Sequence, residues 1–126
     1  MSMAPQDLVE RAINVATLPS VAWVTERTEA NLRWANNGLI SNGEMRSRSL
    51  TVTAIAAVEG GTAAGTVSQQ IAGGDEVGAV VAAAESLARA GRPAEDAAPL
   101  VENYAHEDSW PEPPETTSIE VLDELA

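Results

Sequence analysis

Residues 44–58 alternate between two kinds of side chain, and this alternation constrains the fold more than any other feature. One set is apolar and comprises Leu50, Val52, Ala54, Ala56 and Val58. The intervening set is mostly hydroxyl-bearing and comprises Met45, Ser47, Ser49, Thr51, Thr53 and Ile55. Because successive side chains of a β-strand point to opposite faces, the segment predicts a strand with one packed face and one wetter face. Such a strand needs a covering layer.

Two segments with helical periodicity can supply that layer. In residues 5–17 one face carries apolar side chains, namely Leu8, Ala12, Ile13 and Ala16. Pro5 suits the first turn of this helix, where its missing N–H is not needed, and Pro19 ends it. In residues 75–90 the apolar stripe is continuous and comprises Val77, Val80, Val81, Ala84, Leu87 and Ala88. Asp75 is the expected N-cap of this second helix, and Gly91 followed by Pro93 is the expected stop.

The segments between the helices predict an antiparallel sheet. Residues 20–36 are expected to form one or two strands, and Asn37-Gly38 and Asn42-Gly43 are both typical of hairpin turns. Glu59-Gly60-Gly61 turns the chain into a short strand at residues 62–70. The order predicts an α+β fold with two layers: an antiparallel sheet of three to four strands with two helices on one face, followed by an extended acidic tail.

The composition changes at Gly91-Arg92-Pro93, which marks a boundary between a domain at residues 1–92 and a tail at residues 93–126. The domain holds all seven Arg against nine acids, and the tail holds ten acids and no base. Binding to nucleic acid is therefore disfavoured, because it needs clustered positive charge. The tail is expected to be a Pro-rich linker. A capping-box pattern at Thr117-Ser118-Ile119-Glu120 begins a helix near its end, so we expect the polypeptide to continue in a longer parent protein.

The residue inventory argues against a catalytic site in this chain. It has no Cys, which excludes disulfides and thiolate chemistry, and its one His, His106, cannot form the two-His motif of a zinc hydrolase. No metal or other cofactor is expected, and an independent enzyme is the least favoured interpretation. No apolar run approaches the ~18 residues of a membrane span, and no signal peptide is evident, so a cytoplasmic protein without membrane contact is expected.

Amides, an indole and guanidinium groups gather in residues 31–48. Such groups suit recognition of peptide backbone and carboxylates. The candidates for a peptide path are Trp34, Asn36, Asn37, Asn42, Arg46 and Arg48. Arg46 and Arg48 share the strand face of Leu50 and are expected at the rim of the core. Ordinary turn chemistry, with arginine stems covering apolar surface, explains the same residues without a function, so both interpretations stay open.

Several runs of the sequence together resemble one known family. They are residues 28–38, residues 41–43, residues 46–52, Ala84-Glu85-Ser86-Leu87-Ala88-Arg89-Ala90, and Asp96-Ala97-Ala98-Pro99-Leu100-Val101. Across most of residues 5–102 the chain resembles the N-terminal domain of TldD/PmbA proteins, which are also called modulators of DNA gyrase; PmbA is also called TldE. No single motif is diagnostic, and the similarity lies in the run as a whole.

The resemblance implies a non-catalytic N-terminal domain of a metallopeptidase-related protein involved in proteolysis. In that family a TldD-like and a TldE-like subunit pair, and a zinc-binding H-E-x-x-x-H helix lies later in the TldD-like chain. Zinc is therefore expected only in a TldD-like partner or in a missing domain. The domain would shape the peptide path and the subunit interface, with a TldD-like partner subunit or self-association and a peptide substrate. The alternative is a stand-alone acidic protein-binding module whose tail binds a basic partner.

Overall fold

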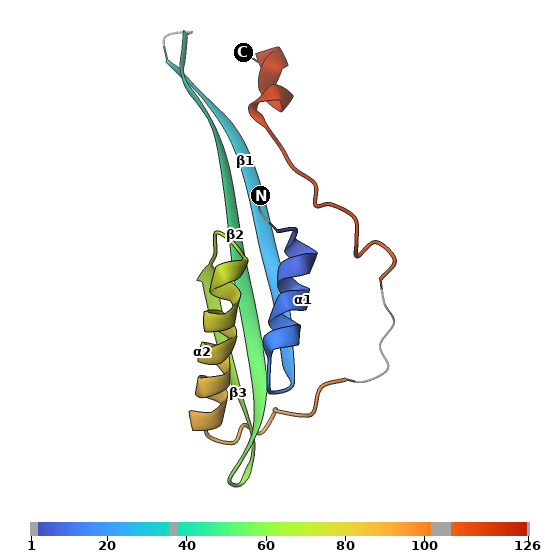
Figure 1. Ribbon diagram of the computed structural model, residues 1–126. Helices are drawn as coiled ribbons and strands as arrows, with labels where there is room; N and C mark the ends of the chain where they lie inside the picture. The colour runs from blue at the N-terminus through green and yellow to red at the C-terminus, as the bar shows by residue number, and fades with distance from the viewer. Residues whose placement is uncertain (1–2, 36–37, 102–106, 126) are drawn as a thin grey trace.

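The computed structural model describes residues 3–35, 38–101 and 107–125, apart from the side chains of residues 39–42 and 123–125. The elements in chain order are α1 (Pro5–Val15), β1 (Ser20–Ala35), β2 (Gly38–Val58), β3 (Gly61–Gln70), the 3₁₀ turn η1 (Gly74–Glu76), α2 (Val77–Ala90) and the 3₁₀ helix η2 (Ile119–Leu125). The three strands form one antiparallel sheet in the order β1-β2-β3 (Figure 1). The predicted α+β class is confirmed, with three strands.

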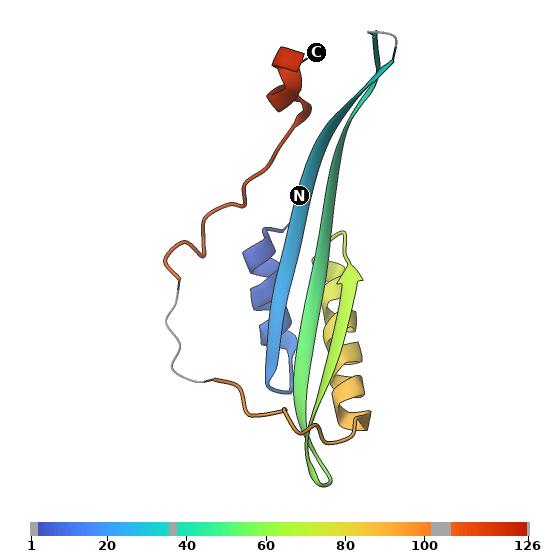
Figure 2. The ribbon, with the colours of Figure 1, turned by 180° about the vertical axis from the view of Figure 1, so that it is seen from behind.

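Both helices lie on the same face of the sheet. Helix α1 packs against β1, α2 packs against β2 and β3, and the two helices touch each other. Figure 2 views the molecule from behind, with the sheet in front of the helices. The predicted arrangement of two layers is therefore confirmed.

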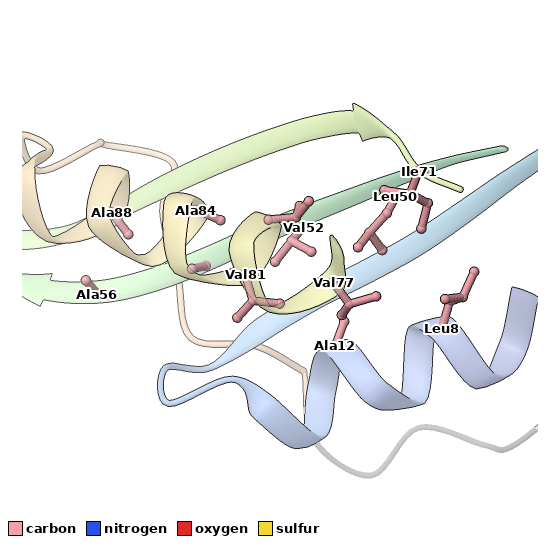
Figure 3. Packing of buried hydrophobic residues seen from close by; sticks show 12 residues of the cluster. Leu8, Ala12, Leu50, Val52, Ala56, Ile71, Val77, Val81, Ala84 and Ala88 are labelled. Carbon is pink, nitrogen blue, oxygen red and sulfur yellow. The ribbon is translucent and has the colours of Figure 1, made fainter. Parts of the chain in front are cut away.

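The core lies between the helices and the alternating strand (Figure 3). Leu50, Val52, Ala54 and Ala56 of β2 are all buried, as the alternation predicts, and Val58 is half-buried against them. The helices contribute Leu8 and Ala12 from α1, and Val77, Val80, Val81, Ala84 and Ala88 from α2. Two residues of the predicted stripes are exposed instead, Ile13 and Leu87. Each lies at the edge of its apolar stripe.

The hairpin turn predicted at Asn42-Gly43 is wrong. Strand β2 runs unbroken from Gly38, and within it Gly43 pairs with Asn31 of β1. The turn at Gly60 and Gly61 is confirmed, since both have a positive φ of 88° and 154°. An Asn-Gly pair permits a tight turn without requiring one, and the long register with β1 prevails here.

The predicted helix ends also need correction. Helix α1 ends at Val15 and not at residue 17. Asp75 does not cap α2: its N-cap is Glu76, no side chain caps the end, and the Glu76 carboxylate accepts a hydrogen bond from the Ala72 N–H (3.1 Å). The expected last helix is a 3₁₀ helix that begins at Ile119, the third capping-box residue, and the Glu120 N–H donates to Ser118 Oγ (3.3 Å).

Helix α2 approaches the sheet closely at Gly65 of β3. A Cβ placed there would lie 2.5 Å from the Ala84 carbonyl oxygen and 2.7 Å from Leu87 Cβ. These are helix atoms that cannot move aside without shifting the whole helix. Gly65 pairs with Ala54, so two small residues in neighbouring strands form the floor on which α2 lies.

A buried carboxylate joins α2 to the loop between α1 and β1. Glu85 accepts hydrogen bonds from the backbone N–H groups of Thr17 and Leu18 (2.7 Å each) and from the Thr17 hydroxyl (3.0 Å). Burial raises the pKa of Glu85, but these hydrogen bonds and the nearby charge of Arg89 outweigh it, so the net pKa lies below its ordinary value. Glu85 is thus one of the few charged side chains that lie within the packed layers of the domain.

The part of β2 that precedes Ser49 pairs only with β1, so the sheet there is two strands wide. Strand β3 pairs with β2 only from Ser49 to Val58, whereas β1 and β2 stay paired as far as Ala35 and Gly38. We call the two-stranded part, residues 27–35 and 38–47, the arm. It extends past the N-terminal end of α1 (Figure 1), and η2 contacts both of its strands.

The close approach at Gly65 predicts a large effect of one methyl group. Gly65→Ala should lower the free energy of unfolding by about 2–3 kcal/mol, because α2 must move away from the sheet. Gly78→Ala is the matched control: its Cβ would meet nothing within 4 Å, and alanine favours the helix, so stability should rise by about 0.5 kcal/mol. Urea unfolding followed by circular dichroism measures both, and equal effects would contradict the packing described.

The Glu85 site predicts a pH-dependent contribution to stability. Because the folded pKa is lowered, the stabilisation is present above the ordinary carboxyl pKa of about 4.3 and is lost as pH falls through the folded pKa. Glu85→Gln should therefore cost on the order of 2 kcal/mol at pH 7, and the deficit should shrink towards pH 3. Glu59→Gln, at an exposed turn, should change stability by less than about 0.5 kcal/mol. A deficit independent of pH would contradict this account.

Candidate functional site

Three charged side chains meet at the base of the arm. Glu26 of β1 and Arg48 of β2 are paired at 3.1 Å, with side chains only 6% and 9% exposed. Arg46 reaches the other oxygen of Glu26 at 3.4 Å, and its side chain is 58% exposed. Arg48 also donates to the Met3 carbonyl oxygen (2.6 Å). One buried ion pair thus joins both strands to the segment that precedes α1.

The strand register explains why these three side chains meet. Glu26 pairs with Arg48 and Thr28 pairs with Arg46, so all lie on the helix-bearing face of the sheet. On β2 the two arginines continue the row of Leu50 and Val52 beyond the apolar core. The expectation that Arg46 and Arg48 line the rim of the core agrees with this arrangement.

The ion pair of Glu26 and Arg48 stabilises the fold and does not present a free group to a ligand. Removing two charges from water is costly, and only good geometry with further hydrogen bonds offsets that cost. Glu26 has both oxygens occupied by guanidinium groups, and Arg48 satisfies a backbone carbonyl as well. Arg46, half in solvent, is the member of the cluster that can contact a ligand.

Two clefts open between the domain and the returning tail, and the second of them borders this cluster. The first, about 330 Å³, lies between α1, β1 and the tail, with Val9, Trp23 and Trp110 among its lining residues. The second, about 400 Å³, is lined by Glu26, Arg46 and Arg48 on one side and by Pro111, Pro113 and Pro114 of the tail on the other. Gln6 lines both clefts.

The structure brings together two of the six candidate residues. Arg46 and Arg48 share the second cleft, whereas Trp34 pairs with Leu39 near the far end of the arm and does not line either cleft. Asn36 and Asn37 lie outside the described residues. The backbone of Asn42 pairs with Leu32, and its side chain also lies outside the described part. Among the described residues, the six candidates therefore do not form a single cluster.

Sequence reasoning missed Glu26 and Gln6. For Glu26 a signal was available, since it continues the alternation of Ala22 and Val24 on β1 and so points to the packed face. A charged residue in such a position needs a partner. Gln6 carried no signal, because its hydrogen-bond partners Pro111 and Glu112 lie 105 and 106 positions away in the sequence.

The described residues include no group of side chains arranged for metal binding. Among them no group of three His, Cys, Asp or Glu side chains could hold a metal ion, and His106 is outside the described part. No helix in the described part of the chain has the length and apolar character needed to cross a membrane.

Comparison with known proteins gave no relative: no family model, no curated protein and no solved structure matches the chain.

The buried pair predicts unequal effects of the two arginines. Arg48→Met should lower the free energy of unfolding by about 3 kcal/mol, because Glu26 is left buried without its main partner. Arg46→Met, at an exposed position in the same cluster, should cost less than about 1 kcal/mol. Adding Glu26→Gln to Arg48→Met should restore part of the loss. Thermal and urea unfolding measure all three, and equal costs for the two arginines would contradict the assignment.

Proposed function

We propose that the chain is a non-catalytic N-terminal domain of a TldD/PmbA-type metallopeptidase-related protein, where it guides peptides and forms part of a subunit interface. The resemblance to that family across most of residues 5–102 supports the proposal from the sequence. The structural support is the arm, a two-stranded extension of the sheet, and the proposal depends mainly on it.

The arm is a structure that needs a partner. A two-stranded ribbon is at best marginally stable in water, and an unpaired strand edge offers N–H and C=O groups to another chain. Within the described residues the arm pairs with no third strand. It also exposes Trp34 (45%) and Met45 (60%), residue types enriched at protein interfaces. Met45 precedes Arg46 on β2 and so lies on the face of the arm turned away from the helices. A second subunit that contacts more than one side of the arm would bury both side chains.

The cluster at the base of the arm supports the peptide-guiding part of the proposal. Arg46 presents a guanidinium group to the second cleft, where it can bind a backbone carbonyl or a carboxylate. The ion pair of Glu26 and Arg48 holds the strands that carry it. A peptide led past Arg46 would move along the face of the sheet that bears the helices.

One observation favours the alternative of an acidic protein-binding module. In the described tail the acids Glu107, Asp108, Glu112, Glu115 and Glu120 are all exposed. A tail of this kind would attract a basic partner, and the association would weaken steeply with salt. Salt dependence therefore separates the two functions.

The interface is tested with a TldD-like subunit encoded in the same genome. The wild-type chain should form a stable complex with it that persists in 0.5 M NaCl, measured by light scattering and calorimetry. The double variant Trp34→Ser/Met45→Ser should bind at least tenfold more weakly, because interface aromatic residues are often energetic hot spots. Ile13→Ser, which removes an equally exposed apolar side chain from α1, should bind as the wild type does.

Two results would count against the proposal. One is the absence of any complex, either with the subunit or between copies of the chain. The other is an arm variant that binds as tightly as the wild type while circular dichroism shows both to be folded. Binding that disappears in 0.5 M NaCl would favour the acidic module instead.

A further inference from the structure

The tail returns to the domain and lies against α1. We use the name return segment for residues 107–119. The Trp110 indole N–H donates to the Glu10 carboxylate (3.0 Å), and the Gln6 side-chain amide donates to the carbonyl oxygens of Pro111 (3.1 Å) and Glu112 (3.5 Å). Figure 1 shows this part of the chain passing beside α1 towards the arm.

The return segment then reaches the arm. The Thr117 N–H donates to Thr28 Oγ1 of β1 (3.0 Å), and the Ile119 N–H donates to the Glu44 carboxylate of β2 (2.6 Å). Helix α1 and both arm strands therefore contribute side chains to one continuous surface. We call this surface, formed by Gln6, Glu10, Thr28 and Glu44, the groove.

Most of these contacts recognise main chain and not side chain. Gln6, Thr28 and Glu44 all bond to backbone groups of the return segment, and only Trp110 is recognised by its side chain. Contacts to carbonyl and N–H groups suit any extended peptide with the right spacing. Prolines at 111, 113 and 114 favour the extended polyproline conformation and reduce the entropy lost on docking.

The return segment fills the groove incompletely. The two clefts of about 330 and 400 Å³ remain beneath it, and Trp23 on the wall of the first is still half exposed. Side chains bulkier than those of the return segment could enter this space. The segment thus resembles a ligand that satisfies the backbone contacts of the site while leaving room in its side-chain pockets.

We propose that the groove is a docking site for extended, proline-containing peptides and that the return segment occupies it within the same chain. The inference rests on the proposed role in guiding peptides, and it adds a regulation of that role. A tethered segment acts at an effective concentration of up to millimolar order, so it competes with an incoming peptide. The groove opens when the segment is displaced.

The test uses the full 126-residue chain and a fluorescein-labelled synthetic peptide with the sequence of residues 107–119. Binding is followed by fluorescence anisotropy. Trp110→Ala, which removes the one side-chain anchor of the tethered segment, should strengthen binding of the labelled peptide at least tenfold relative to the wild type. In that background, Gln6→Ala/Thr28→Val should weaken binding again by at least tenfold.

Matched controls lie elsewhere on the sheet. Gln70→Ala and Thr25→Val remove the same chemical groups from exposed positions on β3 and β1 that make no hydrogen bond to the return segment, and they should leave the affinity unchanged. In ¹⁵N-labelled wild-type chain, the Trp110 indole signal should shift on peptide addition towards its position in Glu10→Gln.

Three outcomes would overturn the inference. The first is no binding of the peptide to Trp110→Ala at 1 mM, and the second is binding that the groove variants do not alter. The third is a Trp110 signal that depends on protein concentration, since the occupant would then be the segment of a second copy. The groove variants leave Trp34 and Met45 intact, so association with a TldD-like subunit remains a separate readout of the proposed function.

Discussion

The close contact between α2 and the middle of the sheet is the constraint on which the rest of the structure depends. Gly65 and Ala54 form a flat floor, and Ala84 and Ala88 lie directly on it. Small side chains bring the helix near, but each buries little apolar area, so the core is thin. Polar contacts must then hold the layers in register. Glu85 does so between α2 and the α1–β1 loop, and Arg48 does so between β2 and the segment that precedes α1.

Much of the fold could be predicted because it depends on local periodicity. The alternation around Val52 identified the packed face of β2, and the helical spacing around Val80 identified the covering face of α2. The ends of elements were less predictable, because they depend on contacts made far away. Asn42-Gly43 has the composition of a turn, yet β1 is sixteen residues long and its pairing with β2 continues past Asn42 to Gly38. Asp75 has the composition of a cap, yet the preceding 3₁₀ turn shifts the start of α2 beyond it.

The candidate site was predictable only in part, for a related reason. Strand alternation places Arg46 and Arg48 on one face from sequence alone. Their shared partner Glu26 lies on the neighbouring strand β1, 22 residues before Arg48 in the chain. Which acid meets which arginine depends on how β1 and β2 are aligned. Gln6 and Glu10 acquire their role from residues 110–112, and no local pattern links them. Long-range polar contacts of this kind follow from the fold and cannot be used to derive it.

The face that bears the helices carries both the return segment and the polar cluster, so the two surfaces adjoin. Thr28, Glu44 and Arg46 continue on the arm the same rows that Glu26 and Arg48 begin at its base. A peptide held by Gln6 beside α1 and by Thr28 on the arm would therefore span the junction that the buried ion pair stiffens. Because the arm is only two strands wide, its direction depends on that junction. A peptide bound in the groove would therefore contact α1 and, at the same time, the arm that carries Trp34 and Met45.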